Sequence, residues 1–222
     1  MLSILFPEFC VGCGYIGSYI CGDCFKKIAS IKNNVCVYCG RGGALGLTHI
    51  GCKRSKGIDG HNSFYKYTSF LRSAIIQAKY HRAHLLLSSL LKNAHPSFYE
   101  TVWQWKKIFS PVVVPVPLHQ KRLLERGFNQ SEIIATHIAK KINLPLKDIL
   151  TRKINTEHLA NIKDNNKRKM IIKNAFCFVG ETVPDAVLLV DDVVTTTSTI
   201  GECARELKRR GVKTVLSFSL AK

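Results

Sequence analysis

The sequence predicts an α/β protein, in which helices flank a parallel β-sheet and a small cysteine-rich module precedes it. Two observations support this prediction. Short apolar runs suited to buried strands alternate with segments of helical periodicity, as in parallel α/β sheets. In addition, seven of the nine cysteines lie between Cys10 and Cys52, in a segment with few long apolar periods. We therefore expect a module at residues 1–60 and an α/β domain at residues 61–222.

The α/β domain is expected to begin with a long helix. Residues 70–94 place apolar side chains near helical spacing, with a break expected near His81, and Pro96 follows the segment. Residues 111–117 are rich in valine and closed by prolines, which is typical of a buried strand that runs into a loop. Asn129 then offers a helix N-cap, because isoleucines follow it at helical spacing.

The second half of the domain continues this alternation. Residues 186–192 predict a second buried strand, residues 198–210 a helix that Gly211 ends, and residues 214–220 a third strand. Residues 151–173 contain seven Lys or Arg and two acidic residues, with little apolar periodicity. We expect this segment to be a mobile basic loop.

The N-terminal cysteines have the spacing of structural zinc sites. Three Cys-x2-Cys pairs and one His-x2-Cys pair fall within 43 residues, and the two-residue spacer lets both ligands face one tetrahedral ion. We assign them in sequence order to two sites: Cys10, Cys13, Cys21 and Cys24, then Cys36, Cys39, His49 and Cys52. Crossed pairing stays open, as does a single zinc ion with a degenerate second site, because a histidine replaces an expected cysteine. Since every ligand position is filled, the zinc is expected to be structural.

The most specific motif in the chain is VLLVDDVVTTTST at residues 187–199. A parallel strand would deliver Asp191 and Asp192 to its carboxyl end, where ligands bind in open α/β sheets. Adjacent carboxylates can accept hydrogen bonds from sugar hydroxyls or bind in a Mg²⁺ shell. The turn that follows would offer hydroxyls and free amides to a phosphate, and consists of Thr195, Thr196, Thr197, Ser198 and Thr199. The alternative is a strand followed by an ordinary helix cap.

The chain is strongly basic, with 33 Lys and Arg against 15 Asp and Glu and a net charge of +18. This excess points to an anionic partner, such as nucleic acid, a phosphorylated metabolite or a membrane surface. Residues 114–131 add a basic loop with Lys121, Arg122 and Arg126, which suits a pyrophosphate, although a solvated turn is an alternative. No apolar run reaches the length of a membrane span, and the start lacks the basic region of a signal peptide, so we expect a cytoplasmic protein.

Together these motifs resemble the ComF family, the ComFC-type competence proteins. The strand–acid–hydroxyl motif also resembles that of type I phosphoribosyltransferases, which bind phosphoribosyl pyrophosphate (PRPP). The resemblance covers nearly the whole chain and is carried by residues 5–13, the cysteine pairs, AKYHRA at 78–83, VPVPLHQKRLLERGFNQS at 114–131, residues 152–176 and residues 187–199. It implies a double zinc ribbon on a type I phosphoribosyltransferase-like domain.

The resemblance also implies ligands and partners. Asp191, Asp192 and the hydroxyl turn would hold PRPP with Mg²⁺, while Lys79 and Arg122 would reach its pyrophosphate. The family works in natural transformation, so the implied partners are incoming single-stranded DNA, a competence helicase and recombination proteins, at the cytoplasmic face of the inner membrane. One departure is Thr197, which stands where the family often has glycine and would be strained at a positive φ.

Three functions stay open from the sequence. The one we favour is a competence protein that binds PRPP and single-stranded DNA. The second is an active phosphoribosyltransferase with an unknown acceptor, for which no catalytic residue can be named. The third is a zinc-ribbon adaptor whose phosphate domain docks or senses without turnover.

Overall fold

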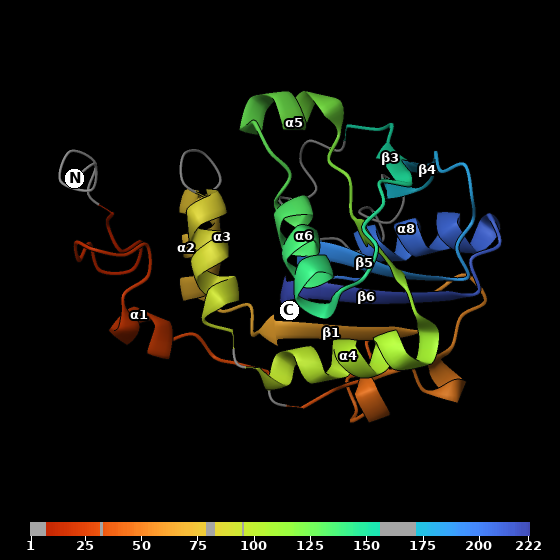
Figure 1. Ribbon diagram of the computed structural model, residues 1–222, viewed down its shortest axis with the longest axis horizontal. Coiled ribbons are helices and arrows are strands. Elements are labelled where there is room, and N and C mark those ends of the chain that lie inside the picture. Colours follow the sequence, from red (N-terminus) through yellow and green to blue (C-terminus); the bar gives the residue numbers. More distant parts are fainter. Residues whose placement is uncertain (1–7, 32, 79–82, 95, 156–171) are drawn as a thin grey trace.

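The computed structural model describes residues 8–31, 33–78, 83–94, 96–155 and 172–222. Four strands form a parallel sheet in the order β1-β6-β5-β2 (Figure 1). Their bounds are β1 Gly60–Tyr65, β2 Val112–Pro115, β5 Ala186–Val193 and β6 Thr214–Ala221. An antiparallel pair, β3 (Leu150–Arg152) and β4 (Phe176–Phe178), lies outside this sheet. The predicted parallel sheet with flanking helices is confirmed.

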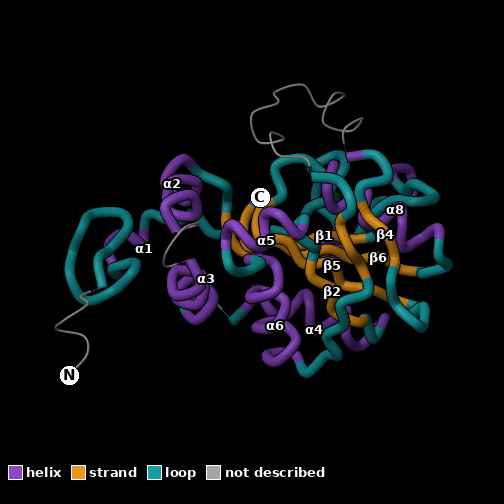
Figure 2. The backbone as a smooth tube through the Cα atoms, turned by 90° about the horizontal axis from the view of Figure 1, so that it is seen from above, coloured by secondary structure: helices purple, strands orange, loops and turns teal. Residues whose placement is uncertain are grey.

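Helices cover both faces of the sheet (Figure 2). One face carries α4 (Ser97–Phe109) and α6 (Gln130–Ile142), with α3 (Ala83–Lys92) packed against α6, and the other carries α8 (Ser198–Arg209). The other helices among the described residues are short or lie at the periphery: α1 (Gly22–Lys26), α2 (Ser69–Ala78), α5 (Gln120–Arg126) and the 3₁₀ turns η1 (Ala44–Gly46) and η2 (Ile50–Cys52). No helix within the described ranges combines the length and apolar character needed to cross a bilayer.

The central strand β5 divides the core into two layers. Leu188 and Val190 lie in the cluster with α6, whereas Val187 and Leu189 lie in the cluster with α8. All four side chains are fully buried, because successive residues of a strand point to opposite faces and both faces are covered. This double burial explains the uninterrupted apolar run in the sequence.

One predicted segment agrees with the fold as far as it is described, and another differs from it. Residues 70–94 form two helices, α2 and α3, and the expected break falls at residues 79–82, outside the described residues. The basic segment after β2 was expected to be a loop, but its centre folds as α5. His119 caps this helix, with Nδ1 accepting from the Lys121 amide at 3.3 Å, and Gly127 ends it at a φ of 75°. Both ends of α5 are therefore explained by local capping interactions.

The expected basic loop at 151–173 is only partly described. Thr151 and Arg152 belong to β3 and pair with β4, so the loop begins later than expected. Residues 156–171 lie outside the described residues.

The connections that follow β2 and β5 leave toward opposite sides of the sheet. After α6, residues 145–147 return to the outer side of β2, where the Val113 amide donates to the Pro145 carbonyl at 2.8 Å. After β5, the chain instead crosses through α8 to β6 on the opposite side. A crevice therefore opens between the carboxyl ends of β2 and β5, which is where open α/β sheets bind ligands.

The cysteine-rich segment packs on both layers of the core. Cys10 and Cys24 belong to the cluster on the α6 side, and Val37 and Ile58 belong to the cluster on the α8 side. Figure 1 shows α1 beside α2, whereas η1 and η2 lie beyond β1. The module is therefore anchored at two places, and a boundary at residue 60 stays a prediction.

Candidate functional site

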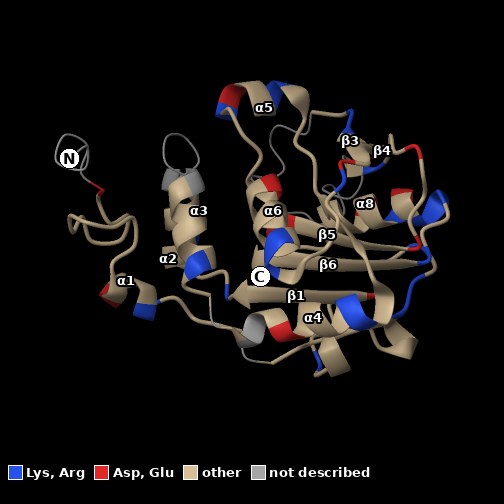
Figure 3. Ribbon diagram, viewed as in Figure 1, with Lys and Arg blue, Asp and Glu red and all other residues tan. Residues whose placement is uncertain are grey.

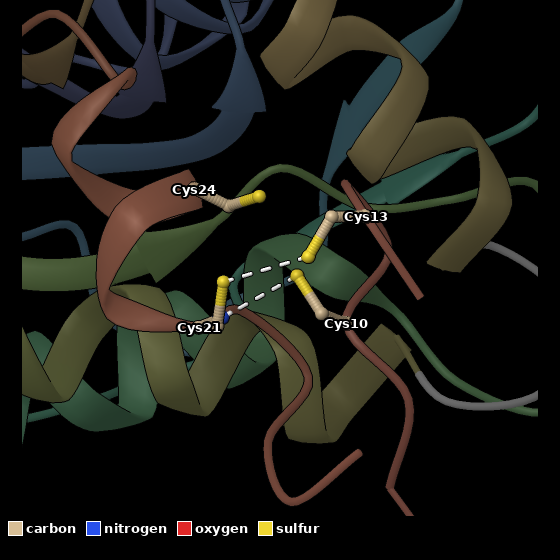
Figure 4. A group of neighbouring side chains, drawn as sticks. All are labelled: Cys10, Cys13, Cys21 and Cys24. Carbon is tan, nitrogen blue, oxygen red and sulfur yellow. Dashed lines mark hydrogen bonds between the residues drawn. The ribbon is translucent and has the colours of Figure 1, made fainter. Parts of the chain in front are cut away.

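The first four cysteines converge on one point from the loop before α1 and from α1 itself (Figure 4). The Sγ atoms of Cys13 and Cys21 are 3.6 Å apart, and all four sulfurs lie within 4.8 Å of one another. Tetrahedral zinc with bonds of about 2.3 Å holds its sulfurs about 3.8 Å apart. The Cys21 amide donates to the Cys10 sulfur at 3.4 Å, which stabilises a thiolate. This donor set fits a zinc ion.

The second set includes His49, which stands where the sequence pattern would have a cysteine. Its ligand atoms, from Cys36, Cys39, His49 and Cys52, also lie within 4.8 Å of one another. His49 Nδ1 is 3.3 Å from the Cys39 sulfur, and its Nε2 is 2.8 Å from the Gly42 carbonyl oxygen. In this arrangement Nε2–H donates to the carbonyl and Nδ1 would be the atom that binds zinc, as metal-ligating histidines are usually held.

The structure thus groups the eight side chains in the two sequential sets, and crossed pairing does not occur. Both sets are complete, and together they support two structural zinc ions. All four positions of each set are occupied by protein ligands, so neither set offers the open position that catalytic zinc requires.

A pocket of about 160 Å³ occupies the crevice between the carboxyl ends of β2 and β5, and we call it the sheet-edge pocket. Four of the predicted ligand-binding residues line it: Arg122, Asp191, Asp192 and Thr199. The other lining residues are Val116, Pro117, Leu118, Arg126, Gln130, Ser131, Arg152 and Val193.

Asp191 is buried at the end of β5, with 9% of its surface exposed. Its Oδ1 accepts from the Ser131 hydroxyl and from the Asp192 amide, both at 2.9 Å. Burial is the main cause that raises the pKa of Asp191 to about 7, and the neighbouring Asp192 carboxylate raises it further. The carboxyl group is therefore held in a fixed orientation, close to its ionisation point at neutral pH.

Three arginines from two elements surround the carboxyl pair. Arg122 and Arg126 come from α5, and Arg152 comes from β3. Arg126 donates to Gln130 Oε1 at 3.4 Å, while Gln130 Nε2 is buried and has no partner among the described residues. Gln130 lines the sheet-edge pocket, and its side-chain nitrogen has no partner among the described residues. This N–H group is therefore available to donate to a ligand.

The hydroxyl turn lies partly in this pocket and partly beside it. Thr199 lines the sheet-edge pocket, whereas Thr197 and Ser198 line an adjacent hollow of about 90 Å³ with Arg54 and Lys56 of the cysteine-rich segment. Thr195 is exposed.

The turn adopts its conformation without strain. Thr197 has a φ of −74°, so the conformation that would favour glycine there is not used. The Thr196 hydroxyl donates to the Ser198 hydroxyl at 3.1 Å. Lys79, the other predicted ligand of pyrophosphate, lies outside the described residues.

Comparison with known proteins agrees with this architecture. A family model described as a double zinc ribbon domain matches residues 1–53. Competence protein F of Haemophilus influenzae is 24% identical over 91% of this chain and 90% of its own length. Competence protein ComFC of Streptococcus pneumoniae is 26% identical over 93% of this chain and 82% of its own. The predicted resemblance to the ComF family is confirmed.

A second kind of relative covers half of the chain. The DNA utilization protein YhgH of Escherichia coli K12 is 34% identical over 50% of this chain and 48% of its own length. The ComF-like chain therefore has relatives whose names refer to competence and others whose names refer to DNA utilization.

The sequence did not single out three polar residues of the sheet-edge pocket in this ComF-like chain, Gln130, Ser131 and Arg152, although they lie within the segments 114–131 and 151–173. Gln130 and Ser131 open α6, and the N-cap at Asn129 was the signal that could have placed them beside the pocket. Arg152 was counted only as part of a basic loop. Nothing in its local sequence shows that β3 brings it to Asp191.

Proposed function

We propose that this protein acts in the uptake of DNA during natural transformation, and that its sheet-edge pocket binds PRPP with Mg²⁺. One observation carries the proposal: the Asp191–Asp192 pair, Thr199 of the hydroxyl turn and three arginines line one pocket at the edge of the sheet. The names of the relatives, competence protein F and ComFC, supply the cellular process.

The chemistry of each group suits one part of PRPP. The carboxylates of Asp191 and Asp192 accept hydrogen bonds from the two ribose hydroxyls, and they are the hard oxygen ligands that Mg²⁺ prefers, directly or through water. The amides at the start of α8 and the hydroxyls of the turn suit the 5′-phosphate. Arginine forks from α5 and β3 suit the pyrophosphate oxygens.

Single-stranded DNA is the macromolecular ligand that we propose. The net charge of +18 supports it, because binding to a strand depends on neutralising its phosphates. The proposal also includes a cytoplasmic location at the inner membrane, partnership with a competence helicase and recombination proteins, and the division into residues 1–60 and 61–222.

Phosphoribosyl transfer is a second candidate for the same pocket. It is favoured by one observation: the acid pair is intact and its orientation is fixed by the Ser131 hydroxyl. Turnover would release pyrophosphate when an acceptor nucleophile bonds to the ribose carbon. A screen for pyrophosphate release with PRPP, Mg²⁺ and candidate bases or amines tests this candidate, and release that Asp191→Asn abolishes would establish it.

The test of the main proposal is transformation frequency in the organism that carries the gene. We expect Asp191→Asn to lower the frequency at least tenfold, while Asp185→Asn leaves it unchanged. Asp185 is a matched control because its side chain is 80% exposed and its partner is the exposed Lys213. Equal frequencies for both variants would show that the sheet-edge pocket is dispensable and would leave an adaptor role.

A further inference from the structure

A second cavity, of about 800 Å³, lies between α3, α4 and α6 and is not used by the proposed PRPP site. Its volume falls within the range of about 300–1,000 Å³ that is usual for small-molecule pockets. The two pockets share α6: Ser131 at its start faces the sheet-edge pocket, and His137 and Lys141 in its second half face the cavity. At about 1.5 Å per residue, 9–15 Å of helix separates the two sets of residues.

Aromatic side chains form part of the wall of this cavity. Tyr99 is 7% exposed and is held in place by its hydroxyl, which donates to the Leu91 carbonyl at 3.2 Å and lies 3.0 Å from His137 Nε2. Trp103, one turn further along α4, is 46% exposed. The cavity therefore offers a fixed ring inside and a large ring that is accessible to solvent.

Lysines of three helices lie at or beside the cavity, and Figure 3 shows basic segments on α3, α4 and α6. Lys92 at the end of α3 and Lys141 of α6 line the cavity, and Lys107 Nζ lies 5.0 Å from the centre of the Trp103 ring. The lining residues that the structure describes include no carboxylate. A ligand that complements this surface carries a flat ring and negative charge.

We propose that this aromatic–lysine pocket receives a base of single-stranded DNA, with the adjoining phosphates on Lys92, Lys107 and Lys141. Stacking on aromatic rings tolerates any base, and the lysines follow the backbone, which is how proteins bind single strands without sequence preference. The inference rests on the proposed function only for the identity of the nucleic acid, because the pocket itself is independent of PRPP.

The test uses the full-length, zinc-loaded protein and a fluorescently labelled twelve-residue oligothymidylate, followed by anisotropy. Trp103→Ala should weaken binding at least tenfold, since stacking contributes about 1–3 kcal/mol per base. Trp103→Phe, which keeps a ring, should retain most of the affinity. Ile108→Ala is the control, because Ile108 is an exposed apolar residue of the same helix that does not line the pocket.

Intrinsic fluorescence gives a second readout. The chain has two tryptophans, and Trp105 is fully buried, so quenching by unlabelled oligonucleotide reports on Trp103. Lys141→Gln should also lower the slope of log affinity against log salt by about 0.7, the value for one phosphate of a single strand.

The outcomes separate the inference from the proposed function. If Trp103→Ala and Ile108→Ala bind the oligonucleotide as tightly as the unaltered protein, the strand binds elsewhere and the inference is wrong, while the proposed function stands. If the unaltered protein binds PRPP but no oligonucleotide, the DNA part of the proposed function fails and the pocket takes another partner. Quenching by thymidine monophosphate as strong as by the oligonucleotide would assign the pocket to free nucleotides instead.

Discussion

Replacing Asp191 by asparagine should stabilise the fold at alkaline pH while removing the ligand site. The carboxyl group is buried beside Asp192, and this environment raises its pKa from 3.8 to about 7. Asparagine keeps the oxygen that accepts from Ser131 and from the Asp192 amide, but it cannot ionise. The two effects of the substitution, on stability and on binding, therefore have opposite signs.

The magnitude follows from proton linkage. Because the folded state holds the Asp191 proton more tightly than the unfolded state, this group destabilises the fold as pH rises from 3.8 towards 7. Ionisation of Asp191 lowers the free energy of unfolding by about 4 kcal/mol in total, of which about 2 kcal/mol is lost between pH 5.5 and pH 8.5. The nearby charges act in both directions: Asp192 increases the penalty, and Arg152 reduces it by favouring the ionised form.

The assay is thermal unfolding of the zinc-loaded protein at both pH values, in buffer without phosphate or magnesium. The gain in Tm of Asp191→Asn over the unaltered protein should be larger at pH 8.5 than at pH 5.5 by about 4–8 °C. Asp185→Asn, at an exposed position, should show no such change. A gain that does not depend on pH, or a variant that is less stable at pH 8.5, would contradict this prediction and show that the arginines keep Asp191 ionised.

Two further predictions concern the cysteine-rich segment. His49→Ala should lower the zinc content from two ions per chain to one, measured by elemental analysis after dialysis. His49→Cys should keep two ions. An unchanged zinc content in the alanine variant would contradict the assignment of His49 as a ligand. Gly57→Ala would place a Cβ 2.5 Å from the Tyr38 hydroxyl, so it should destabilise the fold by about 1–3 kcal/mol in calorimetry. Gly51→Ala, which meets open space, should not, and equal stability of the two variants would contradict the packing.

The parts of the fold that local rules determine were predictable. The apolar run of β5 fixes a strand that is buried on both faces, and the N-cap at Asn129 fixes the start of α6. Strand β1 was missed because its sequence, GHNSFY, is polar. The structure shows why it can be buried: His61 Nδ1 lies 2.9 Å from the Ser217 hydroxyl of β6, a partner that no local pattern reveals.

The candidate sites likewise contain residues that local sequence reveals and residues that only tertiary packing brings together. The eight Cys and His side chains and the Asp191–Asp192 pair follow from short spacings, so the sequence was sufficient to predict that each group lies together. Ser131 bonds to Asp191 across 60 residues of sequence, and Arg152 reaches the pocket through the β3–β4 pairing. Side chains brought together by tertiary packing have no sequence signature of their own.

Binding of PRPP by the sheet-edge pocket is the proposal on which the function of this protein depends. The most direct test is a calorimetric titration of the zinc-loaded protein with PRPP and Mg²⁺ at pH 8, beside Asp191→Asn. We expect saturable binding to one site per chain, weakened about 10- to 100-fold in the variant, since hydrogen bonds to charged groups contribute about 1.5–3 kcal/mol each. No heat of binding in the unaltered protein, or equal affinity in the two, would contradict the proposal.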